Sequence, residues 1–177
     1  MSFTVWFTGL PGSGKSTLAQ RLKQTFIETG LPVELIESDD LAGHYKDLFP
    51  FDTKGRAIIT RTMAVCAERL NRHAIPAIAT GTTPLQKDRD QLRQIIPSVV
   101  LVYCNASETT VRARDPKGLY ALADRGLLPD FPGPGGVYEP PANPDIELDT
   151  ETLTVSQCVD HLIRELRQRR LIPFSKA

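Results

Sequence analysis

Gly9-Leu10-Pro11-Gly12-Ser13-Gly14-Lys15-Ser16-Thr17 is the stretch that decides the fold. It directly follows Phe3-Thr4-Val5-Trp6-Phe7-Thr8, whose β-branched and aromatic residues predict a buried strand. After it, Leu18, Leu22 and Phe26 recur at helical spacing and predict a helix from residue 15 to about residue 29. A strand, a glycine-rich turn of this pattern and a helix, in this order, are typical of a phosphate-binding loop, the P-loop.

The chemistry of a triphosphate explains the spacing of the loop. Gly9, Gly12 and Gly14 let the backbone curve so that successive N–H groups point inward, and the start of the helix adds its positive end. We expect the Lys15 ammonium to reach the β- and γ-phosphates and the Ser16 hydroxyl to hold Mg²⁺. Residues 9–17 are therefore predicted to bind ATP with Mg²⁺; a chance glycine-rich turn is the alternative.

The rest of the chain alternates between strand-like and helix-like segments. Strands are predicted at 33–36, 74–79, 98–104 and 146–148, and helices at 55–73, 87–96, 108–114 and from the Thr154/Gln157 capping box to about 170. Strands separated by helices imply parallel pairing with right-handed crossovers. We predict one α/β domain over residues 1–177: a three-layer P-loop NTPase-type fold, with a five-stranded parallel sheet and helices on both faces.

Composition excludes several classes of partner. Of the 177 residues, 41% are hydrophobic and 24% charged, and 21 basic residues balance 21 acidic ones. This balance creates no strong field for nucleic acid or an anionic membrane. The longest apolar runs fall short of the roughly 18 residues of a membrane span, and the three cysteines have no metal-binding spacing. We expect a cytoplasmic protein that binds neither nucleic acid nor membranes.

An acidic segment follows the second predicted strand. In open α/β sheets, ligands bind outside the carboxyl ends of the strands, where Glu37-Ser38-Asp39-Asp40 is expected to lie. A carboxylate there can order Mg²⁺ or accept a proton from an attacking hydroxyl, and Asp39 is our choice. The alternative is a helix N-cap at Asp39 or Asp40, and both roles can coexist.

Several later segments resemble those of one kinase family. Arg114-Asp115-Pro116-Lys117-Gly118-Leu119-Tyr120, Phe131-Pro132-Gly133 and Tyr138-Glu139-Pro140-Pro141 resemble segments of adenylylsulfate kinases, in the same order along the chain. Ser38-Asp39-Asp40 and Thr82-Thr83-Pro84 are similar to two earlier segments of that family. These enzymes make 3′-phosphoadenylylsulfate from adenylylsulfate and ATP, so the resemblance implies a small-molecule kinase of sulfate assimilation.

The resemblance also implies roles for individual residues. Lys15, Asp39 and Lys117 would be catalytic, with Asp39 near the 3′-hydroxyl and Mg²⁺. Besides Asp39, the contacts with the acceptor nucleotide would come from Phe51, Arg56, Arg61, Thr83, Pro84, Lys117, Gly118, Leu119, Tyr120 and Phe131. Arg56 and Arg61 would face the phosphosulfate, Phe51 and Phe131 would stack on the adenine, and 117–120 would belong to a mobile lid within the segment 115–144. A homodimer is also implied.

The residues themselves leave simpler interpretations open. Phe51 and Phe131 are also consistent with core positions, and the two arginines with solvated helix faces. Departures from the family pattern lie on the acceptor side, where Ala42 replaces an arginine, Asp40 an asparagine and Ile59 another asparagine. Three hypotheses follow: an adenylylsulfate kinase with an altered pocket, a kinase for a different nucleotide-linked acceptor, and a non-catalytic nucleotide-binding module.

Overall fold

Five parallel strands form one sheet in the computed structural model, which describes residues 2–45, 48, 52–128, 130–133 and 136–173. The strands are β1 (Thr4–Thr8), β2 (Glu34–Glu37), β3 (Ala77–Thr80), β4 (Val99–Asn105) and β5 (Ile146–Asp149). Their order in the sheet is β2-β3-β1-β4-β5, so β1, which leads into the P-loop, lies in the middle. The predicted five-stranded parallel fold is confirmed.

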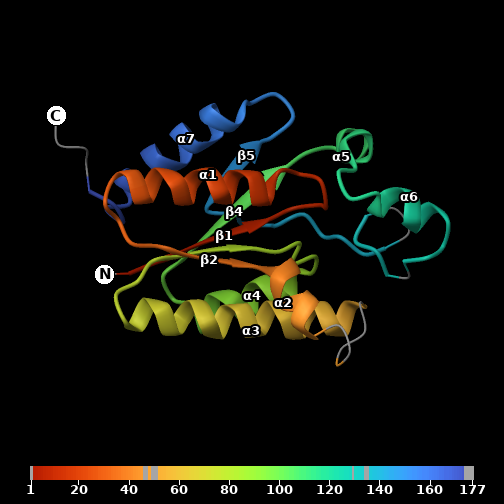
Figure 1. Ribbon diagram of the computed structural model, residues 1–177, viewed down its shortest axis with the longest axis horizontal. Coiled ribbons are helices and arrows are strands. Elements are labelled where there is room, and N and C mark those ends of the chain that lie inside the picture. The colour runs from red at the N-terminus through yellow and green to blue at the C-terminus, as the bar shows by residue number, and fades with distance from the viewer. Residues whose placement is uncertain (1, 46–47, 49–51, 129, 134–135, 174–177) are drawn as a thin grey trace.

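Helices cover both faces of the sheet (Figure 1). One face is covered by α1 (Lys15–Glu28) and α7 (Val155–Gln168), and the other by α3 (Thr53–Arg72) and α4 (Gln86–Ile95). Three shorter helices are α2 (Ser38–Tyr45), α5 (Glu108–Arg114) and α6 (Leu119–Asp124). In Figure 1, α5 and α6 lie beyond the end of the sheet that is remote from the N-terminus.

The alternating side chains of β1 explain why the sheet is buried on both sides. Val5 and Phe7 pack in the cluster that includes Leu22 of α1, while Trp6 packs in a second cluster with Met63 of α3. Successive side chains of a strand point to opposite faces, so a strand with two buried faces needs an unbroken apolar run. All five residues of β1 are buried.

The predicted boundaries differ from the observed ones by at most three residues, and the largest shift is at β3. That strand begins at Ala77 and not at Ala74, because Ala74 adopts a left-handed backbone with φ of 61° after the end of α3. The helix α6 was not predicted. It forms because the Asp115 carboxylate accepts hydrogen bonds from the N–H groups of Tyr120 and Ala121 at its start.

No helix among the described residues is both long enough and apolar enough to cross a bilayer.

Candidate active site

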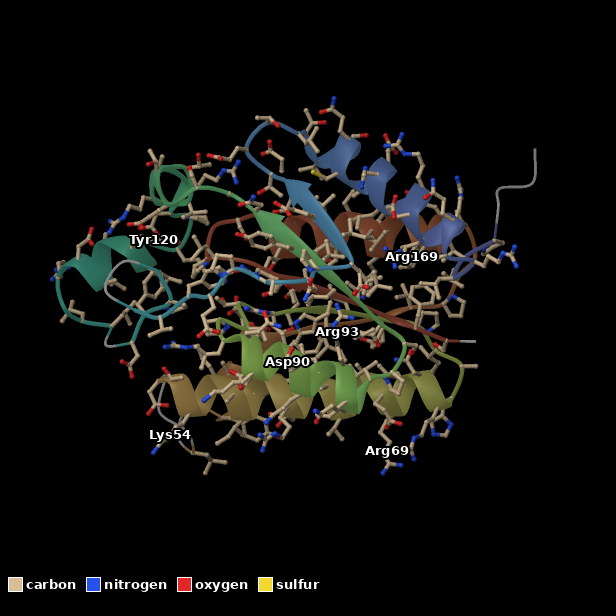
Figure 2. All side chains as sticks on the ribbon, turned by 180° about the vertical axis from the view of Figure 1, so that it is seen from behind. Lys54, Arg69, Asp90, Arg93, Tyr120 and Arg169 are labelled. Atoms are coloured by element: carbon tan, nitrogen blue, oxygen red, sulfur yellow. The ribbon has the colours of Figure 1, made fainter. Side chains whose placement is uncertain are left out.

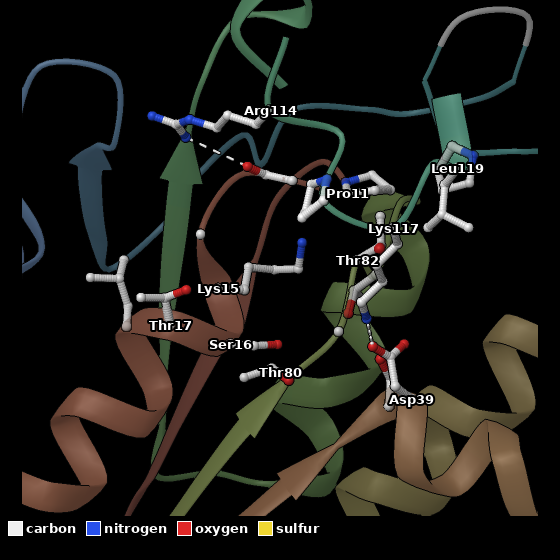
Figure 3. Close-up of a pocket in the computed structure, with 18 of the residues that line it drawn as sticks. Pro11, Lys15, Ser16, Thr17, Asp39, Thr80, Thr82, Arg114, Lys117 and Leu119 are labelled. Atoms are coloured by element: carbon white, nitrogen blue, oxygen red, sulfur yellow. Dashed lines mark hydrogen bonds and ion pairs between the residues drawn. The ribbon is translucent and has the colours of Figure 1, made fainter. Parts of the chain in front are cut away.

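A cavity of about 1050 Å³ opens at the carboxyl ends of the strands (Figure 3). Its walls come from segments far apart in the sequence: the P-loop, α2, the first turns of α3, residues 80–83, the segment 114–120, residues 131–132, and the β5–α7 loop. Parallel strands place all these connections at one edge of the sheet. A pocket for one drug-sized ligand has about 300–1,000 Å³, so this cavity lies just above that range.

The P-loop forms the floor of the cavity. Gly14 has a left-handed backbone, with φ of 90°, and α1 starts at the next residue. The Lys15 ammonium donates hydrogen bonds to the carbonyl oxygens of Gly9, at 2.9 Å, and Leu10, at 2.7 Å. Burial lowers the pKa of Lys15 from 10.5 to about 8. The ammonium group is therefore held inside the loop, where the phosphates of a nucleotide are expected.

Not every residue of the nine-residue loop faces the cavity. The lining includes Pro11, Gly12 and the run Gly14 to Thr17. Leu10 instead packs against a small cluster that includes Tyr120 and Phe131. Gly9 and Ser13 belong to the loop but do not line the cavity, and the Ser13 side chain is fully buried. Direct nucleotide contact thus remains a prediction for the loop as a whole, with the six lining residues the best placed.

Gly9 tolerates no side chain. Its φ is +149°, and an added Cβ would lie 2.6 Å from the Cys104 carbonyl oxygen and 2.7 Å from Ser13 Oγ. We expect Gly9→Ala to lower the free energy of unfolding by about 2–4 kcal/mol, from strain and overlap together. A thermal melt should show the transition roughly 5–15 °C lower.

Gly30→Ala is the matched control for that substitution. Gly30 also has a positive φ, of +76°, but no atom lies within 4 Å of the position that its Cβ would take. Its cost is therefore backbone strain alone, about 1 kcal/mol. Equal melting temperatures for the two variants would contradict the close packing described for Gly9.

Asp39 faces the P-loop from the other side of the cavity. It lies in the first turn of α2, which begins at Ser38, so Asp39 is inside the helix and not at a capping position before it. Lys117 donates a hydrogen bond to Asp39 Oδ2, and both side chains are mostly exposed (Figure 3). Asp40 is also exposed but, unlike Asp39, does not line the cavity. Of the two neighbouring carboxylates, the one chosen from the sequence, Asp39, is therefore the one that lines the cavity.

The segment after α5, predicted to belong to a lid, contacts the P-loop. The Tyr120 hydroxyl donates a hydrogen bond of 2.9 Å to the Pro11 carbonyl oxygen. The Phe131 ring packs edge-to-face on Tyr120 at 5.0 Å, and Arg112 lies over the same tyrosine ring. Phe131 is only 3% exposed, yet it lines the cavity. It is therefore a core residue and also a residue of the cavity wall. Lys117 and Leu119 also line the cavity.

The two arginines of α3 have different surroundings. Asp52 caps this helix, and Arg56, in its first turn, lines the cavity and donates a hydrogen bond to the Asp130 carbonyl oxygen. Arg61 does not line it; its guanidinium donates to Gln91 Oε1 of α4 at 2.9 Å. Five residues correspond to about 140° around a helix. Of the two arginines predicted to face the acceptor, only Arg56 lines the cavity in this structure.

Two further predicted residues are absent from the lining of the cavity, and a third falls outside the part of the chain that the structure describes. Phe51 lies outside the described residues. Pro84 is buried beside the lining residue Thr83 but does not line the cavity itself. Gly118 has a left-handed backbone, with φ of 64°, at the start of α6 and is likewise absent from the lining.

Sequence reasoning missed several lining residues. Thr80 ends β3 and Thr82 follows it, and four residues after β5 also line the cavity: Thr150, Leu153, Thr154 and Val155. Arg114 joins two walls, because it donates hydrogen bonds to the carbonyl oxygens of Thr150, at 2.6 Å, and Gly12, at 3.5 Å. The rule that ligands bind at the carboxyl ends of strands could have located these segments, had it been applied to β3 and β5 as well as β2.

Comparisons with known proteins agree with this geometry. The family model described as adenylylsulphate kinase matches residues 1–149. An adenylyl-sulfate kinase of Chloroflexus aurantiacus is 33% identical over 168 residues, which cover 95% of this chain and 90% of the relative. One from a Synechococcus species is 35% identical over 164 residues and covers 93% of both chains.

A solved structure is similar over nearly the whole fold. The APS kinase of Mycobacterium tuberculosis, in complex with AMPPNP and APS, has a TM-score of 0.89 and 29% identity, and the match covers 94% of this chain and 98% of that one. The match of the family model to most of the chain, together with relatives at 33–35% identity, shows that this chain belongs to the adenylylsulphate kinase family of phosphotransferases with an alcohol group as acceptor.

Proposed function

We propose that this protein transfers the γ-phosphate of ATP to the 3′-hydroxyl of adenylylsulfate. The proposal is carried by one observation: the P-loop and the Asp39–Lys117 pair line the same cavity. A donor on the P-loop and an acceptor beside Asp39 would then meet within one enclosed space. The relative from Mycobacterium tuberculosis, whose structure holds AMPPNP and APS, supports the same assignment.

The residues in the cavity suit an in-line transfer of a phosphoryl group. The P-loop N–H groups and Lys15 would hold the phosphates and stabilise the charge that develops on them. Asp39 would accept the proton of the attacking hydroxyl, and Lys117 would keep the Asp39 carboxylate oriented. The lid, anchored on the P-loop through Tyr120, would exclude water, which is a competing acceptor.

A magnesium ion fits the donor side of the cavity. The Ser16 hydroxyl lines the cavity together with Thr80, and both offer oxygen atoms of the kind that Mg²⁺ prefers. Mg²⁺ typically keeps several waters and binds through few protein ligands plus the substrate phosphates. Ser16 would hold the ion, which would neutralise charge between the β- and γ-phosphates.

The acceptor wall raises a second candidate, a different nucleotide-linked acceptor. Ala42 and Ile59 line the cavity but offer no charge to an anion, and Arg61 is turned away. Arg56 and Lys117 are the cations that line the acceptor side among the described residues. Release of ADP with adenylylsulfate, AMP, ADP and other adenosine phosphates as acceptors distinguishes the two candidates. The first requires adenylylsulfate to give the highest kcat/KM.

Adding a cation to this wall should strengthen binding of adenylylsulfate. Ala42→Arg places a guanidinium on α2, one turn after Asp39, where the side chain faces the cavity. A charge-assisted hydrogen bond contributes about 1.5–3 kcal/mol, so we expect KM for adenylylsulfate to fall roughly tenfold or more. Val65→Arg, at an exposed position of α3 outside the cavity lining, is the control. No gain with Ala42→Arg would favour the second candidate.

Affinity for ATP is expected to fall as the pH rises through about 8. The lowered pKa means that Lys15 is protonated below about pH 8 and loses its charge above it. If the protonated form alone binds the phosphates tightly, the dissociation constant for ATP should rise on the order of tenfold between pH 7 and pH 9. Isothermal titration at several pH values measures this, and proton uptake on binding should appear near pH 8.

Lys15→Arg is the control for the pH dependence. Arginine stays protonated throughout this range, so the variant should bind ATP more weakly than the parent at pH 7 but with little change up to pH 9. The same pH dependence in both proteins would assign the effect to another group.

Two further expectations remain proposals. The family resemblance implies a homodimer, which sedimentation of the purified protein would test. A cytoplasmic location is expected from the composition alone.

A further inference from the structure

Arg89 of α4 is a buried arginine whose hydrogen bonds all end on neutral oxygens. Its side chain is only 1% exposed. The guanidinium donates to the carbonyl oxygens of Thr83 and Glu139, each at 2.6 Å, and to Gln86 Oε1 at 3.1 and 3.3 Å. Burial lowers the pKa of Arg89, but an arginine keeps its charge in proteins. A buried charge without a hydrogen-bonded carboxylate lowers stability. The presence of Arg89 at this position therefore suggests a role other than stabilising the fold.

The first of these partners belongs to the wall of the cavity. Thr83 lines the cavity with a backbone φ of +41°, which is unusual for a β-branched residue. Three hydrogen bonds hold this turn: Arg89 to the Thr83 carbonyl oxygen, Trp6 Nε1 to Thr83 Oγ1 at 3.1 Å, and Thr8 Oγ1 to the Thr82 carbonyl oxygen at 2.7 Å. A strained backbone persists only where its surroundings determine it, and Arg89 supplies the one charged donor.

The second partner lies where the lid segment rejoins the domain. Besides accepting from Arg89, Glu139 donates its N–H to the Pro84 carbonyl oxygen at 2.9 Å and accepts from the Gln86 N–H through Oε2 at 2.6 Å. One guanidinium thus joins the 82–84 turn to the far end of the 115–144 segment. Since Phe131, Lys117 and Leu119 belong to that segment and line the cavity, Arg89 is positioned to affect both sides of the acceptor site.

We propose that Arg89 is a positioning residue for the acceptor nucleotide: its planar fork fixes the 82–84 turn against the end of the lid segment. Arg89 does not line the cavity and touches no reacting group. Its influence passes through the Thr83 and Glu139 carbonyl oxygens and leaves the P-loop unaffected. The proposal rests on the acceptor assignment made under the proposed function.

The test compares two arginines on one helix. Arg89→Met removes the guanidinium fork but keeps an unbranched apolar stem, and Arg93→Met, one turn later, is the control. Arg93 also binds a downstream segment, through the Asn143 carbonyl oxygen at 3.0 Å and Asp145 Oδ2 at 2.9 Å, but does not line the cavity (Figure 2 labels Arg93 and its neighbour Asp90). Steady-state kinetics with separate variation of ATP and adenylylsulfate, and a thermal melt, are measured for each variant.

The expected result is a split between the two substrates. Arg89→Met should raise KM for adenylylsulfate about tenfold or more while KM for ATP changes less than twofold. Arg93→Met should lower the melting temperature with both KM values unchanged. Two results for Arg89→Met would overturn the proposal and leave Arg89 with a structural role only. One is a similar rise of KM for both substrates, and the other is an unchanged KM for adenylylsulfate with a lower melting temperature.

Arg89→Lys keeps the test decisive if the methionine variant does not fold. Lysine retains the charge but cannot span two diverging carbonyl oxygens with a planar fork, so KM for adenylylsulfate should still rise severalfold. An unchanged value would overturn the proposal. Failure of the proposed function is visible separately, because the parent protein would then show no turnover of adenylylsulfate before any variant is compared.

Discussion

Replacing Lys15 by methionine is expected to lower kcat for phosphoryl transfer by about 10²–10³. The Lys15 ammonium is held at the floor of the cavity by the carbonyl oxygens of Gly9 and Leu10. It would meet the phosphates where charge develops during transfer, and loss of one such preorganised donor typically costs this factor. Methionine keeps the length and most of the packing of the side chain. Steady-state assays of ADP release with saturating adenylylsulfate measure the effect.

Lys23→Met provides the control for this loss, because Lys23 lies on the same helix two turns later and does not line the cavity. It should leave kcat within about twofold, as expected for a surface change away from special features. A thermal melt of both variants separates loss of catalysis from loss of folding. Near-normal turnover in a folded Lys15→Met protein would contradict the role given to the P-loop.

Replacing Asp39 by asparagine should lower kcat by about 10²–10⁴, the usual contribution of a general base. The amide cannot accept the proton of the attacking hydroxyl, although it keeps the shape of the carboxylate. KM for ATP should change little, because Asp39 lies on the opposite wall of the cavity from the P-loop. A pre-steady-state assay that mixes enzyme-bound ATP with adenylylsulfate would place the loss in the chemical step.

The neighbouring carboxylate offers a matched control. Asp40 occupies the same first turn of α2 but is exposed and outside the cavity lining. Both Asp39→Asn and Asp40→Asn remove one negative charge near the same helix end, which costs each variant a few tenths to 1 kcal/mol of helix stability. Only the first should lose turnover. Equal losses in the two variants would mean that charge near the cavity, and not proton transfer, explains the effect.

Local patterns explain what the sequence predicted well. The apolar run of β1, the glycines of the P-loop and the helix after them lie within residues 3–29, so neighbouring residues specify each other's conformation. The parallel sheet then follows from the alternation of strands and helices. Family membership was inferred from short segments such as 114–120 and is confirmed by the family model and the curated relatives.

The missed features depend on contacts between distant segments. The helical pattern of α3 was right, but it did not fix which of Arg56 and Arg61 faces the cavity, since that depends on how the helix packs on the sheet. The many prolines and glycines of 115–144 concealed α6, which Asp115 caps. No sequence pattern marked Arg89, because its partners at 83 and 139 come together only in the folded chain.

The position of the transferred phosphate tests the central claim most directly. Purified protein is incubated with ATP, Mg²⁺ and adenylylsulfate, and the product is examined by phosphorus NMR and mass spectrometry. We predict one ADP for each molecule of 3′-phosphoadenylylsulfate, with the new phosphate on the 3′-oxygen. ADP formed without a phosphorylated nucleotide, or a phosphate on any other position, would contradict the account.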